Sequence, residues 1–234
     1  EAENLKVSQA GGVTRVYGKD DEILSFQVGR DTFVVIPHKM ALNAYKVDDR
    51  LVIAEELLLD GGDQLSVISR SLKPKMHVYP ALGRAPRVTQ ASLDSIKPVM
   101  PGASSYQLAF AKKEPQVAVK KVTDRKYSLV AKEGLGELND VFVEIDYVGD
   151  RGMAFIDGLL VTDHFYNEKA WEIGLKSFMP KLDSKEMVLI FHPLHSDQEA
   201  LIDFNHAPEF VDGQFLEVNN IKLVNEYKAI ITFR

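Results

Sequence analysis

The chain has 234 residues, and its 28 basic and 34 acidic residues give a net charge of −6. That length can bury a substantial core, and the scattered charges are typical of a solvated surface, so we expect no nucleic-acid partner. The apolar runs fall far short of the roughly 20 residues that span a bilayer, so we expect no membrane partner. The absence of cysteine excludes disulfides, thiolate metal sites and a cysteine nucleophile.

Short segments rich in Val, Ile, Phe and Tyr recur along the chain with turn residues between them, a pattern that predicts β-strands. In chain order they are 23–28, 32–37, 50–54, 64–69, 77–80, 106–111, 117–122, 127–131, 141–148, 153–157, 159–163, 187–194, 215–218 and 229–233. Only 40–50 and 54–60 suggest helix, and both are short. A doubly wound fold or a (β/α)₈ barrel needs helices between its strands. We therefore predict an all-β fold with two antiparallel β-sandwich or jelly-roll domains.

Turn signals and one irregular stretch divide these strands. Asp60-Gly61, Asp157-Gly158 and Asp212-Gly213 are dipeptides that accept positive φ in tight hairpin turns. The strand pattern fails over 83–104, where prolines, glycines and serines indicate a loop or connector. A boundary near 112–116 gives an N-terminal domain of residues 1–114 and a C-terminal domain of residues 115–234.

Motif searches assign no catalytic residue, cofactor or metal. The nucleophile elbow, the Walker loop, the zinc-protease motif and the dinucleotide fingerprint are all missing. His192 ends a predicted strand, His195 follows a proline, and His206 lies further on, so two imidazoles can converge at a strand end. Their spacing is not diagnostic of a metal site, and partly exposed histidines are the simpler interpretation.

Carboxylates alternate with apolar residues in the segment VFVEIDYVGDRG. If the apolar residues of 141–147 face the core, Glu144 and Asp146 share the opposite face of the sheet. Two such carboxylates fit a glycosidase pair, and Asp146 or Asp150 fits a calcium site. The same pattern describes any solvated sheet face, which is the interpretation that we favour.

Residues 155–175, FIDGLLVTDHFYNEKAWEIGL, hold the candidate ligand-binding residues: His164, Tyr166, Asn167 and Trp171, the only tryptophan of the chain. Sugar recognition places flat aromatic faces against pyranose rings and polar side chains against the hydroxyls, and these four residue types suit both tasks. A tryptophan in a β-sandwich, however, more often packs in the core, and both interpretations remain open.

The segments DVFVEIDYVGDRGMAFIDGLLVTDHFYNEKAWEIGLKSF (140–178) and MVLIFHPL (187–194) carry a family resemblance. A strand ends near Gly152, an apolar strand leads into the Asp157-Gly158 turn, and a second strand ends in aromatics. Over 115–234 this order resembles the galactose-binding-like jelly-roll domain of bacterial β-galactosidase-like proteins of glycoside hydrolase family 35. Less closely, residues 29–70 resemble the β-rich segment that precedes that domain.

The resemblance implies a non-catalytic, carbohydrate-associated β-sandwich module of a sugar-degrading enzyme. Its expected partners are an oligo- or polysaccharide and a catalytic barrel domain that the module braces. The catalytic glutamates of the whole enzymes lie on a (β/α)₈ barrel, which this chain lacks, so the hydrolase activity is not carried over. The polar start EAENLKVSQAGG, the missing cysteines and the resemblance together predict a periplasmic or extracellular location.

Two alternatives belong to other function classes. The first is a glycoside hydrolase or lyase built directly on the sandwich, using Glu144 and Asp146 or His164. The second is a protein-interaction sandwich that pairs through its sheet edges.

Overall fold

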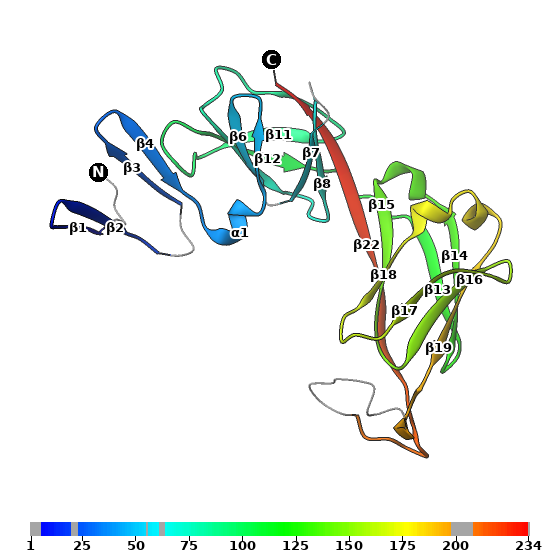
Figure 1. The fold of residues 1–234 in the computed structure, drawn as a ribbon. Helices are drawn as coiled ribbons and strands as arrows, with labels where there is room; N and C mark the ends of the chain where they lie inside the picture. Colours follow the sequence, from blue (N-terminus) through cyan, green and yellow to red (C-terminus); the bar gives the residue numbers. More distant parts are fainter. Residues whose placement is uncertain (1–5, 20–22, 55, 61–63, 198–207, 234) are drawn as a thin grey trace. The chain divides into compact units, whose positions relative to one another are not determined.

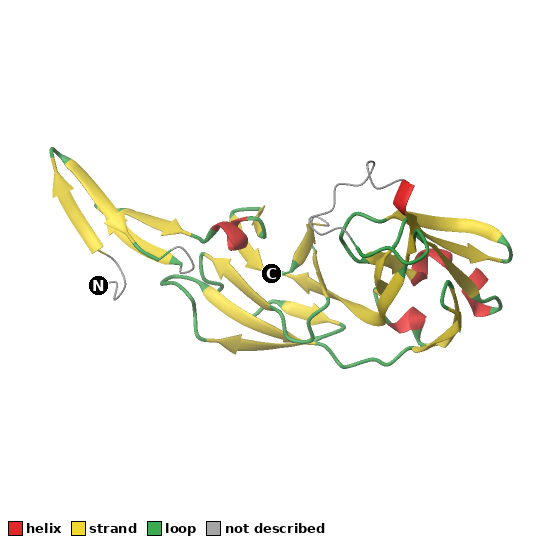
Figure 2. Cartoon of the chain, turned by 90° about the horizontal axis from the view of Figure 1, so that it is seen from below, coloured by secondary structure: helices red, strands yellow, loops and turns green. Residues whose placement is uncertain are grey.

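The computed structural model describes residues 6–19, 23–54, 56–60, 64–197 and 208–233. In these residues nearly all regular structure is β, and the strands pair in antiparallel fashion (Figure 2). The helical segments described are α1 (His38–Ala41), η1 (Leu135–Glu137), η2 (Leu175–Phe178) and η3 (Lys181–Asp183). The predicted all-β class is confirmed.

The chain forms two compact units, and one long strand belongs to both. The first unit consists of Glu1–Ala111 with Tyr227–Arg234, and the second of Lys112–Glu226. The strand β22 (Glu217–Thr232) pairs in its first part within the second unit and in its last part within the first (Figure 1). The expected division after residue 114 stays a prediction about domains. The return of the last residues to the first unit was not expected, because 215–218 and 229–233 look like two separate short strands.

The first unit is built around a five-stranded sheet. Its strand order is β11 (Ser92–Ile96), β12 (Ser104–Ala109), β9 (Lys75–Tyr79), β6 (Arg50–Ala54) and β5 (Ala44–Val47). A second group of strands comprises β7 (Leu57–Asp60), β8 (Leu65–Ser69), the end of β22 and β10 (Arg87–Thr89). Two hairpins come before them, β1 (Lys6–Ala10) with β2 (Val13–Tyr17) and β3 (Leu24–Val28) with β4 (Asp31–Val35).

The second unit is a two-layer sandwich. One sheet has the order β13 (Gln116–Thr123), β14 (Lys126–Glu133), β19 (Met187–His192), β16 (Arg151–Ile156) and β17 (Leu159–Phe165). In the other layer β15 (Asp140–Val148) lies between β18 (Trp171–Gly174) and β22. The rings of Tyr147 in β15 and Phe191 in β19 lie 5.0 Å apart, centroid to centroid, which brings the two layers face to face. A short ladder joins β20 (Leu194–His195) to β21 (Gln214–Phe215).

The strand β15 shows why this sequence forms a sandwich. Val141, Val143, Ile145 and Tyr147 alternate with polar residues and are all buried, as the period of two predicts. Asp157 and Gly158 have φ angles of 53° and 77°, and they join Ile156 to its cross-strand partner in a two-residue hairpin turn. Asp212 and Gly213 also have positive φ angles, and they lie between Val211 and Gln214, which form a β-bridge. Gly61 of the third expected turn lies outside the described residues.

Two local expectations are wrong. The helical suggestion over 40–50 and 54–60 yields only the end of α1, and most of the described residues there form β5, β6 and β7, because cross-strand pairing outweighs weak local helix propensity. The stretch 83–104, expected to be a loop, contains β10 and β11. Both are short, and β11 is an edge strand with a mostly polar sequence, which hides the usual strand signal.

Candidate functional site

Five strands of the second unit meet at an aromatic cluster in the sandwich core. We call it the Tyr147 cluster: Tyr147 of β15, Gly152 of β16, His164 of β17, Trp171 of β18 and Phe191 of β19. The inward-facing positions of these strands place the rings side by side. The centroid of the His164 ring lies 5.8 Å from that of Tyr147 and 6.0 Å from that of Trp171.

The hydroxyl of Tyr147 is the polar centre of this cluster. It donates to the backbone carbonyl of His164 over 2.9 Å and accepts from the backbone N–H of Gly152 over 3.0 Å. The Nδ1 atom of His164 lies 3.0 Å from the same oxygen. Because the hydroxyl proton goes to the carbonyl, the imidazole fits as a donor that carries its proton on Nδ1. Burial raises the pKa of Tyr147, so the hydroxyl stays protonated at neutral pH.

Trp171 is part of the core of the sandwich. Its side chain is 4% exposed, one face stacks on His164 with an interplanar angle of 10°, and Phe191 meets it edge to face. Gly152 lies so close that a Cβ atom on it would be 2.7 Å from the indole ring. A glycine is therefore required in β16 at this point, and the indole faces are not available as a stacking platform for a sugar.

The other three predicted ligand-binding residues lie at increasing distance from the core. His164 is half-buried against Tyr147, and burial lowers its pKa, while a hydrogen bond with Asn167 acts in the opposite direction. Tyr166 is half-buried, with its ring 5.6 Å from that of Tyr147. Asn167 is exposed, and its Oδ1 accepts from the backbone N–H of Lys169. The ligand role of all four residues stays a prediction, and Tyr166 and Asn167 are the two that solvent reaches most directly at the end of β17.

The predicted carboxylates lie on the outer side of β15. Glu144 Oε1 lies 2.7 Å from Lys222 Nζ, its cross-strand neighbour on β22, and Asp146 is exposed. This pairing is typical of a solvated sheet face. Within the described ranges His, Asp and Glu form no group of three that can hold a metal ion, and His206 lies outside those ranges.

A surface that was not predicted lies on the five-stranded sheet of the second unit, on the side that faces away from the sandwich core. We call it the outer face: the outward side chains Met153, Phe155, Leu160, Phe165, Val188 and Ile190 of β16, β17 and β19. The strand register pairs Met153 with Ile190 and Phe155 with both Val188 and Leu160, so these five side chains are contiguous, and Phe165 lies at the other end of β17, opposite Arg151. Leu160 is 52% and Phe165 64% exposed.

The sequence does contain a signal for this surface. The runs MAFI and MVLIF are continuously apolar, whereas a strand with one solvated face alternates. A continuous run indicates a strand that is apolar on both faces. The inner residues of these two runs account for the core, and the outer residues remain to be explained.

Comparison with known proteins finds no matching family model, no significantly similar curated protein and no significantly similar solved structure. The resemblance to the family 35 jelly-roll domain therefore depends on the residues quoted above. Among the described residues, the helices are all too short or too polar to cross a membrane.

Gly152→Ala tests the packing of the Tyr147 cluster. The new methyl group overlaps the indole of Trp171, so we expect the second unit to lose about 1–3 kcal/mol of stability through overpacking. Urea unfolding followed by the fluorescence of Trp171 measures this loss. Gly136→Ala is the matched control, because a Cβ there meets no atom within 4 Å. Equal stability of the two variants would contradict the described packing.

The histidine of the cluster predicts a pH dependence. The folded-state pKa of His164 is lowered, so its contribution to stability is fully present above the unfolded pKa of about 6.5. It is lost as the pH falls from that value through the lower folded-state pKa, because the unfolded chain then binds more protons. The unfolding free energy should therefore fall more between pH 7 and pH 5 in the wild type than in His164→Gln. Parallel curves for the two proteins would exclude this role.

Proposed function

We propose that the chain is a non-catalytic β-sandwich module of a sugar-degrading enzyme, which braces a catalytic domain and contacts carbohydrate outside the cytoplasm. The observation that carries the proposal is the apolar outer face of the five-stranded sheet in the second unit. It complements the family resemblance, which implies a neighbouring catalytic barrel.

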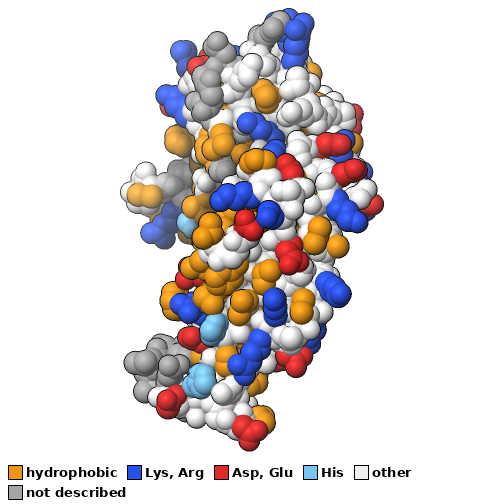
Figure 3. Space-filling view, turned by 90° about the vertical axis from the view of Figure 1, so that its right-hand side faces the viewer, with side chains coloured by type: hydrophobic (Ala, Val, Ile, Leu, Met, Phe, Trp, Pro, Cys, Tyr) orange, Lys and Arg blue, Asp and Glu red, His pale blue; other side chains and the backbone are white. Residues whose placement is uncertain are grey.

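An outer face of this composition favours docking to a protein. An antiparallel sandwich normally presents polar side chains to water on its outer side, and a contiguous apolar patch marks an interaction surface. Figure 3 shows one side of the molecule, where exposed hydrophobic side chains lie among basic and acidic ones. Aliphatic side chains such as Met153, Val188 and Ile190 suit protein side chains better than pyranose rings, which prefer flat aromatic surfaces.

Charged groups at the margin of this face complete the pattern of an interface. Lys126 lies opposite Ile190, Asp163 opposite Met153, and Arg151 opposite Phe165 in the strand register. The Arg151 guanidinium lies 5.6 Å from the centroid of the Phe165 ring. An apolar centre with a polar margin of both charges is the usual composition of a protein interface.

Carbohydrate contact is assigned to the end of β17. Tyr166 and Asn167 offer a ring edge, a hydroxyl and an amide next to a rigid core, and preorganised polar groups of this kind orient sugar hydroxyls. His164 hydrogen-bonds with Asn167 and stacks on the buried Trp171, so these two residues hold the segment in place. In this proposal they act as positioning residues.

Bracing is tested by mixing the chain with the catalytic barrel of a family 35 β-galactosidase that lacks its own C-terminal β-domains. We expect a complex in sedimentation velocity, weakened at least about tenfold by Phe165→Asp or Leu160→Asp, because a carboxylate must then be desolvated within the interface. Both side chains are exposed, so these variants should fold normally.

Val211→Asp is the matched control for bracing, because Val211 is 72% exposed in the same unit and lies outside the five-stranded sheet. The proposal fails if the barrel and the chain sediment separately, or if the control weakens the complex as much as Phe165→Asp does. Doubling of the mass of the chain alone, reversed by Phe165→Asp, would instead identify the outer face as a contact between two copies.

Carbohydrate contact is tested by calorimetric titration with β-galactosides and galactan oligosaccharides. We expect weak binding that is lost in Asn167→Ala while the unfolding midpoint falls only slightly, because Asn167 is exposed and its hydrogen bonds are local. Binding that survives in Asn167→Ala would move the sugar site away from the end of β17. If none of the sugars binds, only the bracing role remains in the proposal.

A further inference from the structure

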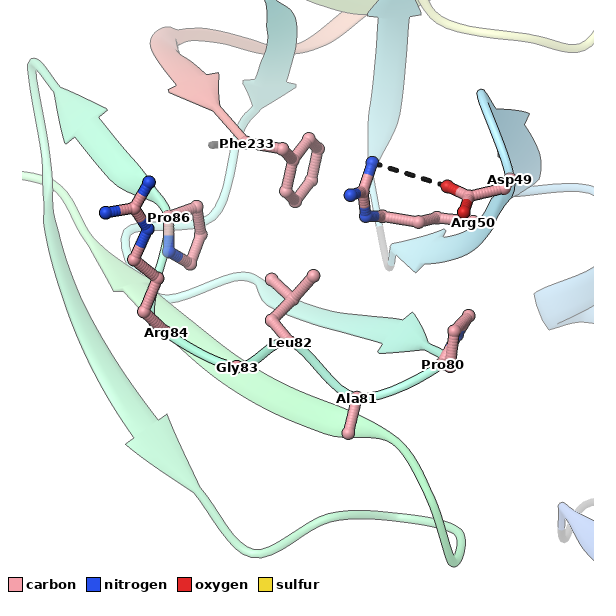
Figure 4. Close-up of a pocket in the computed structure, with 9 residues that line it drawn as sticks. All are labelled: Asp49, Arg50, Pro80, Ala81, Leu82, Gly83, Arg84, Pro86 and Phe233. Carbon is pink, nitrogen blue, oxygen red and sulfur yellow. Dashed lines mark ion pairs between the residues drawn. The ribbon is translucent and has the colours of Figure 1, made fainter.

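The first unit contains a cavity of about 420 Å³ that the Tyr147 cluster and the outer face do not involve. The loop that follows β9, the start of β6 and the residue after β22 line it. In Figure 4 the Arg50 side chain reaches toward the ring of Phe233, Leu82 rises into the space beneath them, and Arg84 with Pro86 lies on the far side. The cavity is within the size range of small-molecule sites in proteins.

The loop that forms the floor of this cavity is held in place by the neighbouring strand region. The backbone N–H of Ala81 donates to the carbonyl of Gly102 over 2.6 Å. The N–H of Leu82 donates to the hydroxyl of Ser104 over 2.9 Å. Because the backbone N–H groups of Ala81 and Leu82 are both hydrogen-bonded, this loop is already ordered before a ligand binds.

The apolar part of the lining suits one face of a six-membered ring. Phe233 and Leu82 are half-buried and present an aromatic and an aliphatic surface to the same space. The Arg50 guanidinium carbon lies over the Phe233 ring, 5.7 Å from its centroid, so a charged donor group covers part of one face of the ring and leaves the rest to a ligand.

The charged part of the lining offers two arginine side chains to an anion. Arg50 and Arg84 contribute two positive charges and Asp49 one negative charge, and Asp48, just outside the lining, adds a second negative charge beside Arg50. Arg50 Nη1 lies 3.6 Å from Asp49 and 3.7 Å from Asp48, longer than hydrogen bonds, and both carboxylates are exposed. Ion pairs of this kind contribute only about 0–1 kcal/mol, so the carboxylate of a ligand can replace them with a bidentate pair.

We propose that this cavity binds a uronic acid residue of an acidic saccharide. The sugar carboxylate pairs with Arg50, an apolar face of the pyranose ring lies on Phe233 and Leu82, and Arg84 lies on the opposite side of the ring. The choice of a sugar among ring-shaped carboxylates rests on the proposed carbohydrate role. The residues are in the first unit, so this site is distinct from the end of β17 in the second.

The test is calorimetric titration of the full chain with methyl α-D-galacturonoside, methyl α-D-glucuronoside, methyl α-D-galactoside and benzoate. We expect the two uronosides to bind and the neutral galactoside to bind at least about tenfold more weakly, because it lacks the group that pairs with Arg50. Arg50→Gln should weaken uronoside binding by a similar factor. Phe233→Ala should also weaken uronoside binding, but the uronosides should still bind more tightly than the neutral galactoside.

Arg125→Gln is the matched control, since Arg125 is an exposed arginine of the second unit that bonds to Gln214. It should leave uronoside binding unchanged. If Arg50→Gln lowers the unfolding midpoint, Arg84→Gln replaces it, with the same expected direction. Equal binding of the neutral galactoside, unchanged binding by the arginine variants or no uronoside binding would overturn the proposal.

Benzoate separates this inference from the proposed function. If benzoate binds through Arg50 and the uronosides do not, the cavity is a carboxylate site and the sugar assignment is wrong. The barrel-binding experiment uses Phe165 and Leu160 of the second unit, so its failure leaves the uronoside result unaffected. The reverse also holds.

Discussion

The hydroxyl of Tyr147 joins three strands of the second unit through one buried oxygen. It accepts a hydrogen bond from the N–H of Gly152 in β16 and donates one to the carbonyl of His164 in β17, while the Tyr147 backbone belongs to β15 in the opposite layer. Such a buried polar group is stable only when its partners are all in place. These two hydrogen bonds join the two layers at the point where the indole of Trp171 leaves room only for a glycine at 152. The hydrogen bond from Tyr147 to the His164 carbonyl also fixes the position of the segment at the end of β17.

The two faces of the five-stranded sheet have different tasks, although the same strands supply both. On the inner face Ala154, Leu189 and Phe191 pack into the core. On the outer face Met153 and Ile190 are equally apolar but only half-buried, so they are not needed for the stability of the sandwich in the same way. Apolar residues beyond those that fill a core are best explained by contact with another surface. The proposed bracing role depends on this apolar face, whereas the proposed sugar role depends on polar groups at the end of β17.

Local periodicity predicted much of this fold, because alternation in 141–147 and the Asp157-Gly158 turn are decided by neighbouring residues. It could not show that 217–218 and 229–232, which lie in two separate expected strands, belong to one strand, since the polar residues between them are paired through partners distant in sequence. The aromatic residues after β17 were noticed from the sequence, but whether Trp171 faces inward is decided by Gly152 and Phe191 in other strands. The cavity of the first unit combines Arg50, Leu82 and Phe233, which no local pattern connects.

The strand β22 has a consequence for how the protein is made. Its residues from Tyr227 onward pair with β8 and β10 of the first unit, yet they are synthesised after the whole of the second unit. Until they leave the ribosome, the backbone groups of β8 that face them lack their native partners, and Ala229 and Ile231 are missing from the core. The first unit to be started is therefore the last to be completed. In a growing chain the second unit can reach its native state first, and residues 227–232 then complete the sheet of the first unit.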